Sequence, residues 1–184
     1  TNIGPRSLVQ KLMEYNVPFQ VRDAIPSLFE HWIARDLICY LKMALGSRDR
    51  QTFLNIMNRP KRYISRNMVT TATVNLIEMA DSVKDKPWLA ERIERFLYDI
   101  KVLAKMAPYQ AIGYIRETIG YDDFLKEYAA FRKMKNEDLL EVLLEVQETA
   151  KECKKIEDWF EYIEEYEEEL EIQLKAGRQK QADS

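Results

Sequence analysis

The sequence of 184 residues is poor in the side chains on which metal and covalent chemistry depend. It contains one histidine, His31, and two distant cysteines, Cys39 and Cys153, which form no C-x-x-C pair. This composition excludes the usual zinc sites and the catalytic groups built from a nucleophile and a histidine. The two cysteines lie among apolar and long side chains, which indicates reduced thiols and predicts a cytoplasmic protein.

Glycine, proline and long apolar runs are also scarce. Five glycines and six prolines are too few for a turn-rich β-sandwich or barrel. No apolar run approaches the roughly 18 residues of a membrane span, so we expect no membrane partner. The phosphate-binding patterns G-x-x-x-x-G-K-[ST] and G-x-G-x-x-G are both missing, so we expect no nucleotide cofactor in this chain. The chain begins at Thr1 without leader character, and we expect it to be a piece of a longer protein.

Helical periodicity dominates what is present, and it predicts an all-α fold, an irregular multi-helix domain. One short segment, 18–22, alternates apolar and polar residues and is compatible with a single strand. The last residues, 177–184, are polar and predict a linker. The expected helices are 5–16, 27–45, 49–59, 65–79, 87–106, 108–119, 122–134, 137–152 and 156–175.

Charge is divided unevenly along the chain. Residues 1–110 carry 17 basic and 11 acidic side chains, whereas 111–184 carry 11 and 20. Nine acidic residues and no basic one lie between Glu157 and Glu171. This run favours the solvated face of an amphipathic helix, and the alternative is an acidic surface that binds a partner.

The basic charge of the first half is concentrated in one segment. From Arg48 to Arg66, six basic side chains stand against Asp49 alone. The turn 58–66 places cations around Pro60 and leads into a predicted helix N-terminus, where free N–H groups favour a phosphate. Charge alone leaves two interpretations open, a clamp for a nucleic-acid backbone or a basic solvated surface.

Five segments resemble, in order, blocks of the UvrD/Rep/PcrA-like superfamily 1 DNA helicases. The family patterns in question are R-[ST]-N-x-x-S-R-x-L-E, x-I-P-Y, F-F-E-R, K-D-x-x-x-Y-L-R and N-x-P-x-R-G-I-G. Residues 66–184 agree with the family only in being helical and of suitable length. The matching segments are Arg6–Leu8, Asn16–Phe19, Leu28–His31, Asp36–Lys42 and Asn58–Ser65.

The resemblance implies a place within a helicase. Residues 1–22 would be the edge of the RecA-like subdomain 2A, 23–176 the helical 2B subdomain, and 177–184 the linker. The parent chain would use ATP and Mg²⁺ to unwind DNA in repair or replication restart, whereas this piece alone would have no ATPase activity. Its partners would be the backbone of duplex DNA, bound without sequence preference, and the other helicase subdomains. The implied DNA-binding residues are Arg59, Lys61, Arg62, Ile64, Ser65 and Arg66.

One departure from the family bears on that contact. The pattern Gly-Ile-Gly stands here as Tyr63-Ile64-Ser65. Loss of both glycines predicts loss of a positive φ and of the closest backbone approach, with neighbouring cations compensating. The alternative function is a helical protein-interaction or regulatory module with no direct DNA contact, using the acidic helix 156–175 or the apolar stripes.

Overall fold

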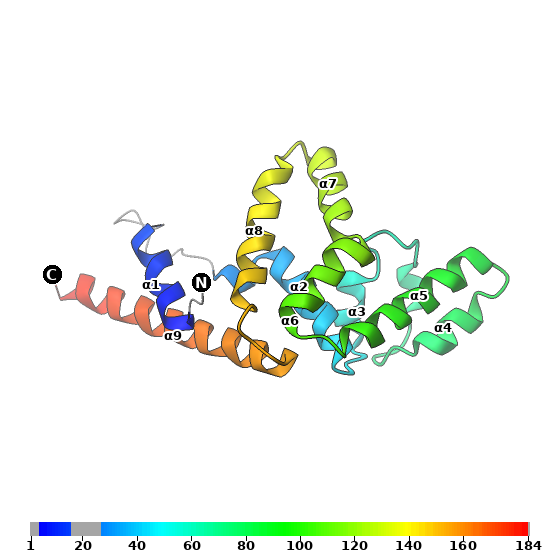
Figure 1. Ribbon diagram of the computed structural model, residues 1–184, viewed down its shortest axis with the longest axis horizontal. Helices are drawn as coiled ribbons and strands as arrows, with labels where there is room; N and C mark the ends of the chain where they lie inside the picture. Colours follow the sequence, from blue (N-terminus) through cyan, green and yellow to red (C-terminus); the bar gives the residue numbers. More distant parts are fainter. Residues whose placement is uncertain (1–3, 16–26, 184) are drawn as a thin grey trace.

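The computed structural model describes residues 4–15 and 27–183, and nearly all of its regular structure is helical (Figure 1). Within those residues the only β-type pairing is one isolated bridge between Asp49 and Thr73. The predicted all-α class is therefore confirmed. The α-helices are α1 (Pro5–Tyr15), α2 (Trp32–Ala44), α3 (Arg50–Ile56), α4 (Leu76–Ser82), α5 (Pro87–Leu103), α6 (Pro108–Tyr114), α7 (Tyr121–Arg132), α8 (Asn136–Thr149) and α9 (Ile156–Ala182), and the short helical turns are η2 (Leu28–Glu30), η3 (Arg66–Met68) and the π-type η4 (Ile115–Ile119).

Helix α2 is the centre of the core. Its residues Ile33, Leu37, Tyr40 and Leu41 are fully buried, as their helical spacing predicts. Helices α3, α5, α6 and α8 all pack against it. Two of its side chains, Asp36 and Tyr40, hydrogen-bond to Arg59 and Arg62 in the loop that follows α3.

Two helical hairpins extend from this centre in different directions (Figure 1). Helices α4 and α5 pair at one end of the molecule, and α7 and α8 pair in a second projection. Gly120 joins η4 to α7 with φ 98°, a left-handed conformation that glycine adopts without steric cost. The loop after α3 lies between the two hairpins, with side chains that contact α5 and α7.

Helix α9 joins the core to the N-terminal helix. Trp159 and Tyr166 are buried, and the ring of Phe29 packs edge-on against both. Helix α1 packs along a later part of α9 (Figure 1). The predicted helix end near residue 175 was wrong, because α9 continues to Ala182. The residues after 174 include Lys, Ala, Arg and Gln, which favour helix by their intrinsic propensity. The helix therefore continues beyond the last residue of its apolar stripe.

Two other predicted boundaries were wrong. The helix expected at 65–79 is instead the turn η3, an extended segment and then α4. The run 69–74 contains β-branched residues that disfavour helix, and the side chain of Asn75 caps the new start. The helix expected at 27–45 is divided at His31 into η2 and α2. The possible strand at 18–22 lies outside the described residues.

Candidate nucleic-acid interface

The loop that follows α3 is held in shape by the side chain of Asn58. Its Oδ1 accepts hydrogen bonds from the backbone N–H of Arg62 at 3.2 Å and of Ile64 at 3.1 Å. Its Nδ2 donates to the carbonyl of Ile64 at 2.8 Å. One amide therefore ties both ends of the segment 62–64, which closes the turn around Pro60.

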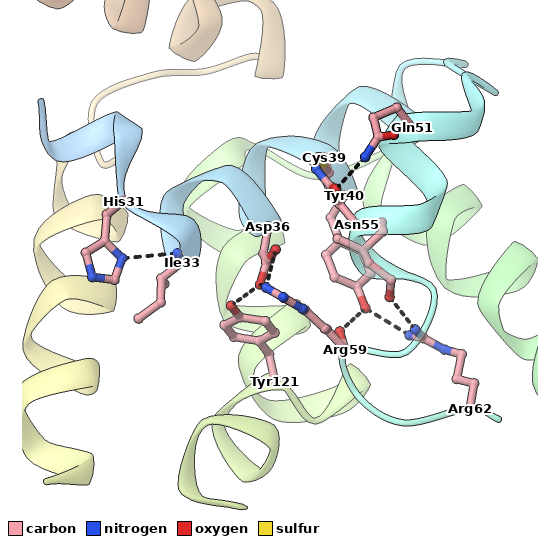
Figure 2. A network of polar contacts seen from close by, with 11 residues as sticks. His31, Ile33, Asp36, Cys39, Tyr40, Gln51, Asn55, Arg59, Arg62 and Tyr121 are labelled. Atoms are coloured by element: carbon pink, nitrogen blue, oxygen red, sulfur yellow. Dashed lines mark hydrogen bonds and ion pairs between the residues drawn. The ribbon is translucent and has the colours of Figure 1, made fainter. Parts of the chain in front are cut away.

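Arg62 is a buried residue, and Figure 2 shows its guanidinium beside the hydroxyl of Tyr40. Its guanidinium donates to the carbonyls of Ile56 and Met57 at 3.0 and 3.1 Å and to the hydroxyl of Tyr40 at 2.9 Å. It also stacks near the ring of Phe96, 4.7 Å from the centroid. Arg62 was predicted to bind DNA, but its Nη1 and Nη2 atoms donate hydrogen bonds within the fold.

Arg59 is half-buried in a second polar cluster (Figure 2). Its Nη1 donates to both carboxylate oxygens of Asp36, at 3.2 and 3.0 Å, and Tyr121 donates to the same carboxylate at 2.6 Å. Burial raises the pKa of Asp36, although the hydrogen bond from Tyr121 and the charge of Arg59 oppose that rise. The guanidinium also lies 5.4 Å from the ring centroid of Trp32. Arg59 therefore keeps only part of its charge available to solvent.

The remaining predicted residues of the loop differ in their exposure to solvent. Lys61, Ser65 and Arg66 are exposed, whereas Ile64 is buried beside Arg62. The hydroxyl of Ser65 accepts from the backbone N–H of Asn67 at 3.2 Å and so caps the turn η3. Residues 62 and 64 are anchored in the core, and their neighbours 61 and 65 are open to solvent.

Tyr63 adopts the backbone conformation that was expected to be lost with the family glycine. Its φ is 63°, in the left-handed region, so the prediction that a positive φ would disappear was wrong. The hydrogen bonds of Asn58 on both sides of Tyr63 impose this conformation on a bulky residue. The phenol ring is exposed and contacts Trp88 and Arg92 of α5.

Three functional candidates were not identified from the sequence. Asn58 was read as part of a family motif but not as the group that shapes the loop. Trp88 and Arg92 lie one helical turn apart on α5, a spacing that places an aromatic ring beside a cation. That spacing could have identified the pair from the sequence, but only the fold brings the two side chains next to Tyr63.

The chain matches one family of known proteins over nearly its whole length. The family described as UvrD-like helicase C-terminal domain matches residues 1–182. The chain belongs to this UvrD-like helicase family. The match covers both the basic loop and the helices that support it. No solved structure shows a significant match to the chain.

Two curated relatives in this helicase family carry descriptive names. The putative ATP-dependent DNA helicase YjcD of Bacillus subtilis is 20% identical over 171 residues, which cover 89% of this chain. The ATP-dependent DNA helicase Rep of Buchnera aphidicola is 23% identical over 141 residues, which cover 69% of it. In each case the chain spans 22% of the relative's length.

Among residues 4–15 and 27–183, no group of three or more His, Cys, Asp or Glu side chains is arranged to hold a metal ion. No helix in that part of the chain is long and apolar enough to cross a membrane.

Proposed function

We propose that this chain is the helical 2B subdomain, with the edge of subdomain 2A, of an ATP-dependent DNA helicase that uses Mg²⁺. Membership of the UvrD-like helicase family and the names of the two relatives support this proposal. Its role is to hold the duplex ahead of the unwinding junction or to regulate the motor. Its partners are duplex DNA and the other helicase subdomains of a cytoplasmic parent protein.

Within that function, the loop 58–66 is proposed to contact the DNA backbone. The observation that carries this proposal is the alternation of anchored and exposed side chains in one short segment. Arg62 and Ile64 fix the loop internally, which leaves Lys61, Ser65 and Arg66 free of the core and open to solvent. A loop fixed in this way presents its cations with little loss of backbone entropy on binding.

The chemistry of these donors predicts binding without sequence preference. Lysine, arginine and serine side chains recognise phosphate oxygens, which carry no base information. Tyr63 has a positive φ, so the backbone here follows a shape that glycine adopts readily. The ring of Tyr63 nevertheless stands where a glycine would leave open space, and this shifts the contact from backbone amides toward side chains.

Salt dependence of duplex binding tests the proposal. Two exposed cations and the half-exposed Arg59 predict a log–log slope of about −1.8 to −2.7, since each phosphate contact contributes about 0.9. Replacing Lys61 and Arg66 together by alanine should flatten the slope by about 1.8, equally for different duplex sequences. Fluorescence anisotropy with a labelled duplex, measured between about 50 and 200 mM salt, provides the slope.

A matched control removes the same charge elsewhere. Lys101 is exposed near the end of α5, and Lys105 is exposed two residues beyond that end. Lys101 lies about 20 Å along the helix axis from Trp88. The Lys101→Ala/Lys105→Ala variant should leave the slope unchanged. If both double variants behave alike, the loop is not the DNA contact, and the interaction-module function becomes the better explanation. Arg62 is left out of the design because its removal would disturb the core.

A further inference from the structure

Exposed aromatic rings gather on one face of this protein. Among the side chains that the structure describes, the large aromatic residues classed as exposed are Tyr63, Trp88, Tyr98 and Phe131, with exposed fractions of 55%, 50%, 57% and 84%. Solvent exposure of one such ring is ordinary, but grouping of all four on adjoining surfaces is the mark of a binding site.

These rings line two shallow hollows, one beside the loop and one on α5. One hollow lies between the loop and α7 and includes Lys61, Tyr63, Tyr128 and Phe131. The other lies on α5 and includes Trp88, Arg92, Arg95 and Tyr98. Tyr63 and Trp88 connect the two, because their ring centroids are 6.2 Å apart in an edge-on arrangement.

Cations are interleaved with the rings. The guanidinium of Arg92 lies 5.1 Å from the ring centroid of Tyr63 and 5.2 Å from that of Trp88. The ammonium of Lys61 lies 4.9 Å from Tyr63, and Arg95 lies 5.6 Å from Tyr98. Each cation therefore holds a ring in place and also offers charge to a ligand at the same surface.

We propose that this aromatic face binds single-stranded nucleic acid by base stacking. The face is defined by Lys61, Tyr63, Trp88, Arg92, Tyr98 and Phe131. The proposal rests on the proposed function, because the face continues from the loop that is proposed to hold the duplex. Unpaired bases expose their faces to aromatic rings, whereas the bases of a duplex are already stacked on each other. The duplex and an unpaired strand meet at a helicase junction, and adjoining surfaces suit that meeting.

The charge of the face favours stacking over phosphate attraction. Glu91 and Glu94 line the hollow on α5 and Glu127 lines the other, so the acidic side chains balance Lys61, Arg92 and Arg95. A surface with balanced charge releases few counterions. Binding of a single strand here should therefore depend less steeply on salt than binding of duplex to the loop.

The test compares two probes on the intact chain. One is a labelled oligothymidylate of about 15 nucleotides, which forms no duplex and lies within the site sizes of such surfaces. The other is a blunt duplex of similar length. Trp88→Ala should weaken oligothymidylate binding at least about fivefold, the lower end for loss of one stacked base, and leave duplex binding within about twofold. Ile172→Ala, which removes an exposed apolar side chain on α9, should change neither.

Tryptophan fluorescence gives a second, direct readout. Of the three tryptophans, Trp159 is buried and Trp32 is partly covered by Arg59, so Trp88 is the one placed to stack on a base. Oligothymidylate should quench the emission, and Trp88→Phe should abolish the quenching while retaining binding, because phenylalanine keeps a ring. This variant also keeps the proposal testable if Trp88→Ala is unstable.

The outcomes separate this proposal from the function on which it rests. If the chain binds duplex but not oligothymidylate, the aromatic face serves another ligand, such as a protein, and the duplex function stands. If Trp88→Ala weakens both probes equally, the face is part of the duplex site and stacking is refuted. If the chain binds neither probe, the proposed function itself fails.

Discussion

At the scale of single residues, neighbours in the basic loop have opposite roles. Lys61 is exposed, whereas the guanidinium of Arg62 is enclosed by four acceptors, the carbonyls of Ile56, Met57 and Pro60 and the hydroxyl of Tyr40. The charge of Arg62 is thus a structural element of the core. Composition shows how many cations a segment carries. Whether each cation is buried depends on which hydrogen-bond acceptors the fold brings to it.

Replacement of Arg62 should therefore affect stability. Arg62→Ala leaves several buried acceptors without donors and removes the contact with Phe96, so we expect a loss of at least about 3 kcal/mol in the free energy of unfolding. Lys61→Ala is the matched control and should change that free energy by no more than about 0.5 kcal/mol. Urea denaturation measures both. Equal stabilities of the two variants would show that Arg62 is not a core residue.

Tyr63 provides a test of backbone conformation. At a positive φ, a side chain with a Cβ costs about 1–2 kcal/mol, whereas glycine costs about 0.5–1 kcal/mol in unfolded-state entropy. Tyr63→Gly should therefore be more stable than Tyr63→Ala by roughly 0.5–1 kcal/mol. Both variants lose the same ring, so the comparison of their urea midpoints isolates the backbone. The usual order, with alanine more stable, would contradict the left-handed assignment.

At the scale of elements, His31 makes the start of α2 sensitive to pH. Its Nδ1 accepts a hydrogen bond from the backbone N–H of Ile33 at 3.1 Å, which requires that nitrogen to be unprotonated. Burial lowers the pKa of His31 below its ordinary value of 6.5. The folded state therefore favours the neutral ring, and its contribution is complete above pH 6.5 and is lost as the pH falls through the folded pKa.

The matching experiment replaces His31 by asparagine, which caps a helix but does not titrate. Between about pH 7.5 and about pH 5, the native protein should lose more stability than His31→Asn. Carboxylates that titrate in this window are common to both proteins, so the difference belongs to His31. Parallel pH profiles would show that the ring does not titrate with folding.

The sequence predicted elements well where apolar periodicity and capping agree. Asp49 accepts from the backbone N–H of Thr52 as the N-cap of α3, and Phe53 and Ile56 are buried as their spacing requires. The two signals were not always sufficient, because Ser65 and an apolar stripe predicted a helix at 65–79, whereas Ser65 caps only the turn η3 and α4 begins at Leu76. Which side chains of the loop are exposed could not be predicted from the sequence either. Their exposure depends on the hydrogen bonds of Asn58 and on rings of α5, which lie far away in the sequence.

The site expected around Pro60 stays a prediction, and the structure adds only which of its side chains are buried. The cluster of cations around Pro60 was identified, yet only tertiary contacts divide it into anchors and exposed donors. Asp36 shows the same limit, since nothing in the sequence near it indicates a partner 85 residues away, Tyr121. No periodic pattern in the sequence indicates polar pairs between residues so far apart.

At the scale of the whole molecule, the chain carries no phosphate-binding loop of the usual kind in its sequence. We therefore expect the isolated chain to bind no ATP and to hydrolyse none, with or without DNA. Isothermal titration calorimetry and a phosphate-release assay measure the two. ATPase activity that follows the purified chain and is abolished by a substitution within it would contradict this expectation.

Helix α9 is a long helix that connects the core with α1. Its 27 residues form one uninterrupted helix about 40 Å long. The side chains of Trp159 and Tyr166 are buried in the core. Arg6 of α1 pairs with Glu169 further along, at 3.4 Å, and Val9 is buried nearby in the same apolar cluster. Because no break in the helix separates these two attachments, we expect α1 and α9 to move with the core as one rigid body.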